Sequence, residues 1–246
     1  MKLQRLPWAG IRLENEQGAV LIDPVSRILE QFGGSKEPMY PLDHFGGADA
    51  VLITHLHEDH FDPEAIARAF GADIPVYVPE EAAETARKSG LSTVTGVKLG
   101  ASLELANGIT AIAAPAVDGL GHPQVSWVVK SGGKTVFHGG DTLWHGHWWK
   151  IASKYGPIDA ACLPVNGAIM EYPGLTPSGE PICLTPEQAV SAAVVLGAGV
   201  LVPIHYKAIH HPPLYSETPD IDSRLEKASI GKIKLNAIKA TESIIL

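Results

Sequence analysis

The stretch Thr54-His55-Leu56-His57-Glu58-Asp59-His60 places four potential metal ligands close together at the boundary between two predicted elements. The apolar run Val51-Leu52-Ile53 before it predicts a buried strand. Asp62-Pro63 after it predicts a helix start, with aspartate as N-cap and proline at the first helical position. A solvated polar turn would explain one of these histidines alone. Four such groups on one strand-to-helix turn favour a bound cation instead.

The direction of these side chains favours two neighbouring metal ions over one. His55 and His57 are two residues apart at the end of a strand, so their side chains point to the same side. Asp59 and His60 follow in the turn, which directs them elsewhere.

At this point the sequence resembles the metallo-β-lactamase-fold hydrolases, whose signature is His-x-His-x-Asp-His after an apolar strand. The match is complete at His55, His57, Asp59 and His60, and the resemblance spans almost the whole chain. It implies an α/β fold, a four-layered αβ/βα sandwich of two facing mixed β-sheets flanked by helices. It also implies a two-metal site at one edge of the sheets and three later ligands: a histidine, a bridging aspartate and a final histidine.

Three residues occupy these later places in order: His122, Asp141 and His205. Asp141 and His205 each follow a predicted strand, over 135–138 and 200–204 respectively, and strand ends are rigid supports for a site. His122 is assigned by its order and by the irregular loop 115–123 around it. His138 is its rival, although a position inside a strand favours a core histidine.

The resemblance leads to a hypothesis about the complete metal centre. His55, His57 and His122 would hold one divalent ion, Asp59, His60 and His205 the other, and Asp141 would bridge them. Two such ions activate a water and polarise a scissile carbonyl or phosphoryl oxygen, with Asp59 or Asp141 as the proton acceptor. Imidazole and carboxylate suit Zn²⁺, Mn²⁺ and Fe²⁺ alike, and zinc is placed first from the family at large.

Candidate substrate contacts lie beside and beyond the presumed bridge. Trp144 could form an apolar wall and His145 a catalytic contact, whereas an aromatic-rich helix start packed into the core is the alternative. Within the superfamily the chain looks most like the branch of L-ascorbate-6-phosphate lactonase and N-acylphosphatidylethanolamine phospholipase D. That resemblance implies Asn166 and Tyr206 as pocket residues, and an aspartate at Asp23 that braces the metal-binding loop. Capping of the segment after Pro24 is the alternative for Asp23.

Length and composition restrict the class of protein. A chain of 246 residues with 45% apolar content is consistent with one hydrolase domain over 1–246. A net charge of −8 without a basic run disfavours nucleic-acid binding and leaves a small molecule as the expected partner, with a homo-oligomer open. No secretory signal or membrane span is visible, which predicts a cytoplasmic protein. Cys162 and Cys183 have no metal-site spacing and are expected to be reduced structural thiols.

The remaining pattern predicts alternating helices and strands. Helices are expected over 62–70, 79–89, 185–197 and 220–227, and two strands within 1–25. A hairpin is expected over 103–114 with its turn at Asn107-Gly108, and a second over 125–138. Loop 26–47 and insert 168–184 are candidate pocket walls.

Three functions remain open from the sequence. The first is hydrolysis of a small ester or lactone, possibly a phosphorylated sugar lactone. The second is a metal-dependent phosphodiesterase, which a basic groove would favour. The third is a non-hydrolytic metal-binding module that keeps the fold.

Overall fold

A computed structural model describes residues 1–105 and 108–246, in which two seven-stranded sheets face each other. The first sheet has the order β16-β1-β2-β3-β4-β5-β6, formed by β1 (Lys2–Arg5), β2 (Ile11–Glu14), β3 (Ala19–Ile22), β4 (Ala50–Leu52), β5 (Val76–Pro79), β6 (Val94–Val97) and β16 (Ser243–Ile245). The second has the order β15-β13-β11-β10-β9-β8-β7, formed by β7 (Ser102–Glu104), β8 (Thr110–Pro115), β9 (Val125–Ser131), β10 (Lys134–His138), β11 (Ala160–Pro164), β13 (Val200–Ile204) and β15 (Lys234–Leu235). A small antiparallel pair joins β12 (Ile169–Met170) to β14 (Tyr215–Ser216).

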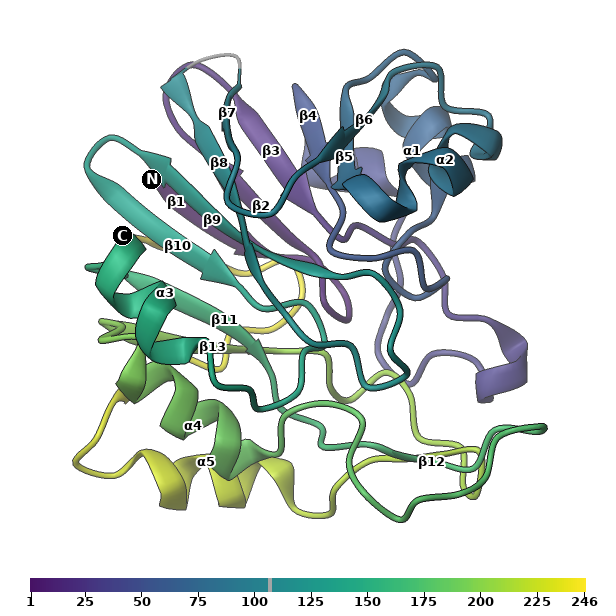
Figure 1. The fold of residues 1–246 in the computed structure, drawn as a ribbon, viewed down its shortest axis with the longest axis vertical. Helices are drawn as coiled ribbons and strands as arrows, with labels where there is room; N and C mark the ends of the chain where they lie inside the picture. Colours follow the sequence, from purple (N-terminus) through teal and green to yellow (C-terminus); the bar gives the residue numbers. More distant parts are fainter. Residues whose placement is uncertain (106–107) are drawn as a thin grey trace.

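Helices cover the outer face of each sheet. They are α1 (Pro63–Phe70), α2 (Ala83–Ala86), α3 (Trp148–Tyr155), α4 (Pro186–Val195) and α5 (Ile221–Ser229), with short 3₁₀ turns η1 (Glu30–Phe32), η2 (Leu42–Phe45), η3 (Glu80–Ala82) and η4 (Arg87–Ser89). Figure 1 shows α1 and α2 next to β5 and β6, and α3, α4 and α5 grouped on the other side near β11 and β13. The four-layered αβ/βα sandwich implied by the resemblance is therefore confirmed.

Three apolar clusters hold these layers together. One lies between the sheets and includes Val20 and Trp127. A second packs the first sheet against α1 and α2 and includes Leu21, and a third packs the other sheet against α3 to α5 and includes Trp148. Adjacent residues such as Val20 and Leu21 face different clusters because strand side chains alternate between the two faces. Both faces of β3 are thus buried, as its continuous apolar sequence requires.

The local helix signals in the sequence are confirmed. Asp62 caps α1 by accepting a hydrogen bond from the Ala65 backbone N–H at 3.1 Å. Thr185 and Gln188 form a reciprocal capping box at the start of α4. Of the predicted hairpin over 103–114, the antiparallel pair β7 and β8 is present, while Asn107 of its predicted turn lies outside the described residues.

Two parts of the fold differ from the sequence-based prediction. Residues 79–89 do not form one helix but the succession η3, α2 and η4, because Pro79 pairs with Val97 as the last residue of β5. Residues 1–25 contain three strands, since β1 is added at the outer side of β2 and pairs with β16 from the other end of the chain. None of the helices in the described part of the chain is long and apolar enough to cross a membrane.

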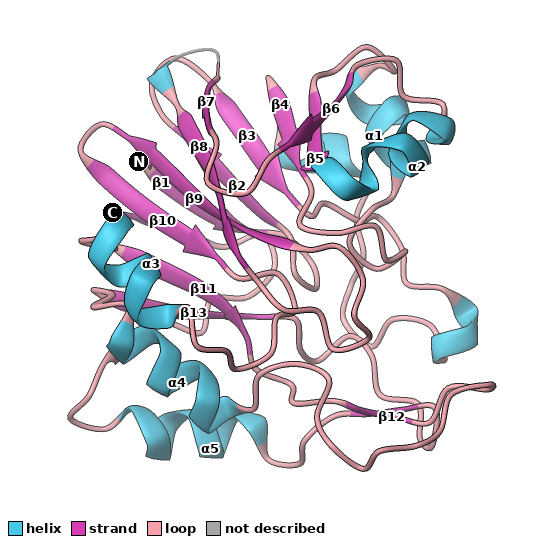
Figure 2. Cartoon of the chain, viewed as in Figure 1, coloured by secondary structure: helices cyan, strands magenta, loops and turns pink. Residues whose placement is uncertain are grey.

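Long loops gather at one end of the sandwich, around β12, as Figure 2 shows. They include parts of loop 26–47 and insert 168–184. The Val125 backbone N–H donates to the Thr54 carbonyl at 3.0 Å, which ties the start of β9 to residues 54–60 of the other sheet, the candidate metal-binding turn. The turn that follows β4 is therefore fixed where the two sheets meet.

Candidate metal centre

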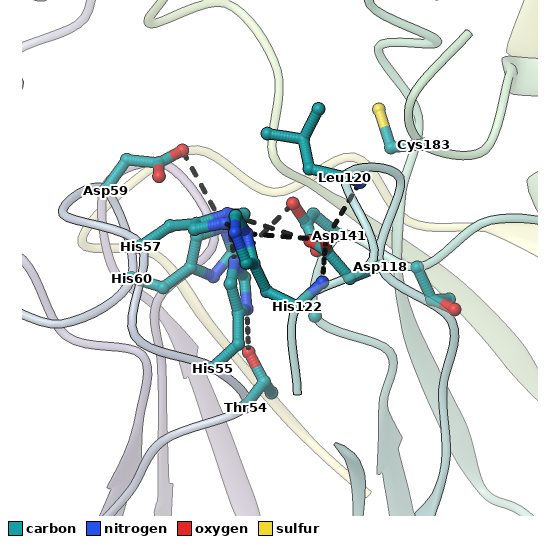
Figure 3. Close-up of polar contacts among 12 residues, drawn as sticks. Thr54, His55, His57, Asp59, His60, Asp118, Leu120, His122, Asp141 and Cys183 are labelled. Carbon is teal, nitrogen blue, oxygen red and sulfur yellow. Dashed lines mark hydrogen bonds and ion pairs between the residues drawn. The ribbon is translucent and has the colours of Figure 1, made fainter. Parts of the chain in front are cut away.

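A first group of ligand atoms comes from both sheets. His55 and His57 lie on the turn after β4, Asp118 on the loop after β8, and Asp141 just after β10, with one ligand atom of each within 4.8 Å of the others. His55 Nε2 lies 2.8 Å from His57 Nδ1 and 3.6 Å from Asp141 Oδ2. His57 Nδ1 lies 3.7 Å from Asp118 Oδ1. Figure 3 shows how the side chains of this group lie together.

A second group lies beside the first and consists of Asp59, His60 and His205. Asp59 Oδ2 lies 3.7 Å from His60 Nε2 and 3.6 Å from His205 Nε2. His205 follows β13, so its backbone comes from the sheet opposite to that of Asp59 and His60. The structure thus brings six of the seven predicted ligands into two adjacent groups, and adds Asp118.

Buried atoms without a hydrogen-bond partner mark the space between these residues. Asp141 Oδ1, His60 Nε2 and His205 Nε2 are buried and have no partner among the described residues. Buried polar atoms are almost always hydrogen-bonded, so three such atoms within two ligand groups fit bound cations. Asp141 faces His55 through Oδ2 and keeps Oδ1 unpartnered, as a bridging carboxylate would. Imidazole nitrogen and carboxylate oxygen donors suit a divalent transition metal.

Two buried side chains behind the ligands fix their orientation. Asp23 accepts the Thr54 N–H at 2.7 Å through Oδ1, and through Oδ2 lies 2.6 Å from Thr54 Oγ1 and 2.8 Å from His60 Nδ1. It therefore braces both the turn and His60, in agreement with the expectation from the resemblance. Trp8 Nε1 donates to Asp59 Oδ2 at 3.0 Å. Sequence reasoning missed Trp8, because only the pairing of β1 and β2 brings the loop between them to the metal-binding turn.

Charges within the centre control its protonation. Burial would lower the pKa of His60, but Asp59 and Asp23 beside it raise that pKa to about 9. Burial raises the pKa of Asp141 to about 6. Burial would also raise the pKa of Asp59, yet His60 and His205 hold it below its usual range. A ligating imidazole has to be deprotonated, so metal binding at His60 competes with proton binding, and metal affinity is expected to fall with decreasing pH.

Three residues around the centre have left-handed backbone conformations. The φ angles of Trp8, Asp23 and His205 are 58°, 46° and 58°. Such conformations cost of order 1–3 kcal/mol each in non-glycine residues and persist only where the surroundings impose them. Here the His205 N–H donates to the Trp8 carbonyl at 3.0 Å, and the two rings lie 4.0 Å apart. The strain is thus concentrated at the point where the two sheets present their ligands.

Asn166 lies behind His205 and not in a pocket, unlike the prediction of a substrate contact. It is fully buried, its Oδ1 accepts from Cys183 Sγ at 2.6 Å, and its Nδ2 donates to Tyr215 Oη at 2.8 Å. Its Oδ1 is also 3.4 Å from His205 Nδ1. Asn166 therefore positions His205, and its strand-end location alone could not distinguish the two roles. Both cysteines are free and buried, as expected.

Tyr206 also differs from the prediction of a pocket residue. Its buried ring lies between two cations, with Arg5 Cζ at 5.3 Å and Lys207 Nζ at 4.9 Å from the ring centroid. Because it follows His205 directly, the turn that points His205 toward the metal centre directs Tyr206 away.

The aromatic segment after Asp141 corresponds only in part to the alternative interpretation, a helix start packed into the core, because Trp148 and His145 are buried whereas Trp144 and Trp149 are exposed. Trp148, in the first turn of α3, is fully buried, and the ring of His145 stacks on it with centroids 4.2 Å apart. Trp144 packs 6.1 Å from Trp148, and neither Trp144 nor His145 lines the cavity over the metal centre. The structure therefore does not support the predicted substrate contact of Trp144 or the predicted catalytic contact of His145.

His122 stands outside the first ligand group. Its Nδ1 lies 2.7 Å from His57 Nε2, on the opposite side of the His57 ring from His55, and its side chain is 59% exposed. The side chain of Asp118 is 1% exposed and reaches the group from the same loop. The loop was expected to supply a ligand, but the residue that reaches the centre is Asp118.

A cavity of about 560 Å³ opens over both ligand groups. Its floor includes His57, Asp59, Asp118, Asp141 and His205. Its apolar walls include Phe32 from loop 26–47, Leu120, Ile209, and Met170, Leu175 and Ile182 from insert 168–184. The two segments predicted to shape a pocket therefore do so. None of the described residues that line the cavity is a lysine or arginine.

The carboxyl group of Glu217, which contacts the loop after His205, leads to a prediction of how the stability of the protein depends on pH. Its Oε1 accepts the Lys207 N–H at 2.9 Å, and burial raises its pKa from the usual 4.5 to about 7. Because the folded-state pKa is raised, the stability contributed by this carboxyl group is complete below the unfolded-state pKa and is lost as the pH rises through about 7. We expect Glu217→Gln to gain thermal stability relative to the unmodified protein between about pH 5 and about pH 8, measured by melting curves. A melting-temperature difference that does not change with pH would contradict this assignment.

The chain is similar to known proteins over most of its length. The family model described as Beta-lactamase superfamily domain matches residues 19–206. A UPF0173 metal-dependent hydrolase of Korarchaeum cryptofilum is 30% identical over 229 residues, covering 91% of this chain and 90% of that protein. Another from Rubrobacter xylanophilus is 29% identical, covering 99% and 96%. The solved structure of a metallo hydrolase from Ignicoccus hospitalis is 25% identical, with a TM-score of 0.75 and coverage of 99% and 97%.

Proposed function

The chain belongs to the β-lactamase superfamily, in its UPF0173 group of metal-dependent hydrolases, and from this premise we propose that it hydrolyses a small uncharged lactone or ester. The observation that carries this choice of substrate is the chemistry of the cavity over the metal centre. Its walls are mainly apolar, and no lysine or arginine lies among its described lining residues. An uncharged organic substrate matches such walls better than an anion does.

The same observation argues against two other substrate classes. A phosphorylated sugar lactone or a phosphodiester carries a negative charge, and proteins usually recognise phosphate oxygens with arginine or lysine. Glu58 and the carboxylates of the metal centre line this cavity instead. Bound cations would neutralise part of this negative charge, and the remainder would repel a negatively charged substrate. We therefore place phosphate-containing substrates second to uncharged ones.

The residues of the chain divide into ligands and supports in this proposal. When bound, a pair of divalent ions would activate water and polarise the carbonyl oxygen of the substrate. Asp59 and Asp141 line the cavity, and in this proposal either carboxylate would accept the proton of that water. Leu175 and Ile182 would exclude bulk water from the acyl group, and Asn166 would keep His205 in position.

The test compares substrate classes on protein reconstituted with Zn²⁺ or Mn²⁺. Aliphatic lactones, an uncharged aryl ester and a chromogenic phosphodiester would be assayed in one series. We expect kcat/KM for the best lactone or ester to exceed that for the phosphodiester by at least about 10²-fold, since a phosphate oxygen finds no cationic side chain here. Equal or greater turnover of the phosphodiester would refute the proposed substrate class.

A variant of the cavity wall makes this test sharper. Leu175 lies in the wall and its side chain is exposed, so Leu175→Arg can introduce a cation there without disturbing the core. Turnover of the uncharged substrate should fall while turnover of the phosphodiester rises, because the added charge reverses the electrostatic preference of the wall. The control is Leu99→Lys, because Leu99 is exposed and lies outside the cavity. It should change neither the turnover of the uncharged substrate nor that of the phosphodiester.

A further inference from the structure

The loop after β8 supplies a carboxylate to a position where the resemblance led us to expect an imidazole. Asp118 Oδ1 faces His57 Nδ1 at 3.7 Å, and its side chain is almost completely buried. Its other oxygen, Oδ2, accepts the backbone N–H groups of Leu120 and His122, each at 2.8 Å. Two hydrogen bonds fix one oxygen and leave the other directed at the histidines, so the carboxylate is held in place before any ion binds.

The position of His122 excludes it from the same ion. An imidazole ring carries its two nitrogens on different edges, and His57 directs Nδ1 toward His55 but Nε2 toward His122. His122 Nδ1 contacts the outer nitrogen of His57 and, at 3.8 Å, Oδ2 of Asp118, the oxygen that two backbone N–H groups already hold. His122 therefore orients the ring of His57 from outside, a role that partners of metal-binding histidines often have.

From these contacts we infer that His55, His57 and Asp118 are the protein ligands of the first ion, with Asp141 shared, and that this site selects Fe²⁺ or Mn²⁺ more strongly than a three-histidine site would. Two imidazoles and one carboxylate with open positions form a ligand set typical of non-haem Fe²⁺, and carboxylate oxygens suit Mn²⁺. Asp59, Asp118 and Asp141 together also bring three negative charges to the two ion positions. A harder, more anionic ligand set shifts preference away from zinc.

The inference rests on the metal centre of the proposed function, but it is tested by metal content and not by turnover. The inference about the ligands can therefore fail while the proposed hydrolysis stands, and the reverse is also possible. Metal-free protein would be equilibrated without oxygen against equal concentrations of Zn²⁺ and Mn²⁺, and in a second series Zn²⁺ and Fe²⁺. Retained metals would be counted by mass spectrometry and Mn²⁺ by electron paramagnetic resonance. The quantity compared is the ratio of zinc to manganese or iron retained, since zinc binds most nitrogen and oxygen sites more tightly than either.

Three variants separate the roles of the two residues. Asp118→His should raise the zinc-to-manganese ratio on the order of tenfold, because it restores a third imidazole. His122→Ala should lower metal affinity, because the ring of His57 loses its outer partner, but it should keep the original zinc-to-manganese ratio and retain both ions at saturating metal. Asp118→Asn retains an oxygen that can accept the two backbone N–H groups, so it can fold, yet it should lose most of the metal at the first site.

Two results would overturn the inference. One is an identical metal ratio in the unmodified protein and in a folded, metal-binding Asp118→His variant. The other is loss of one ion in His122→Ala together with full retention in Asp118→Asn. Circular dichroism of every variant identifies any that fails to fold, in which case Asp118→Asn decides alone.

Discussion

His57→Ala is expected to lose bound metal and to lower kcat/KM by roughly 10³-fold or more. Both ring nitrogens of His57 contact another histidine, His55 on the inner side and His122 on the outer side. Removing the side chain of His57 deletes one candidate ligand. It also leaves His55 and His122 without the histidine that each of them contacts. Metal ions contribute several kcal/mol of transition-state stabilisation, and each 1.36 kcal/mol corresponds to a factor of ten in rate. Metal analysis and turnover on the best lactone or ester measure the two losses.

A matched control for this variant is His44→Ala. His44 is an exposed histidine that stacks on Tyr40, and it does not line the cavity over the metal centre. The control should keep metal content and turnover. A folded His57→Ala protein with full metal content and normal turnover would show that the turn after β4 is not the metal centre.

Gly119→Ala is expected to displace the loop that carries Asp118 and to reduce both stability and activity. A Cβ atom at position 119 would lie 2.1 Å from the carbonyl oxygen and 2.7 Å from the Cα of Ile182. Because both atoms belong to the backbone of Ile182 in the insert, no side-chain rotation can relieve these contacts. Overpacking of this kind costs about 1–3 kcal/mol, and each kcal/mol lowers the melting temperature of a chain of this length by about 2–4 °C.

The effect on activity should exceed the effect on stability. Asp118 is the neighbour of Gly119, and a displacement of about 1 Å in a catalytic group can lower the rate by about 10²-fold. Gly47→Ala is the control, because a Cβ there meets nothing within 4 Å and its backbone does not require glycine. If Gly119→Ala keeps the melting temperature and turnover of the control, the close packing of the loop against the insert would be refuted.

The metal-binding turn illustrates what local sequence can predict. His55, His57, Asp59 and His60 are neighbours in the chain, and a strand end followed by a capped helix fixes their directions. The structure also brings Asp141 and His205 into the two candidate ligand groups, and each follows a strand. The directions of His55 and His57 followed from the alternation of side chains along a strand, whereas the resemblance implied the later ligands and the order of elements located Asp141 and His205.

Residues that depend on contacts between distant segments could not be predicted in this way. Trp8 reaches Asp59 only because β1 and β2 lie in the same sheet as β4, and Asn166 reaches His205 only because β11 lies next to β13. The pairing of β1 with β16 joins the two ends of the chain, which no local pattern indicates. Trp144 and His145 were assigned to substrate because their nearness to Asp141 in sequence was taken as nearness to the cavity.

The sequence by itself determined that four potential metal ligands lie on a turn between a strand and a helix, because this follows from short-range spacing and apolar patterning. The four-layered sandwich was predicted from the family resemblance that this turn carries. Only the tertiary structure showed that Asp118, and not His122, lies within the first candidate ligand group. These residues are four positions apart in an irregular loop, where side-chain direction has no fixed period. Backbone hydrogen bonds from Leu120 and His122 and the packing of Gly119 on Ile182 turn the carboxylate inward and leave the imidazole at the rim.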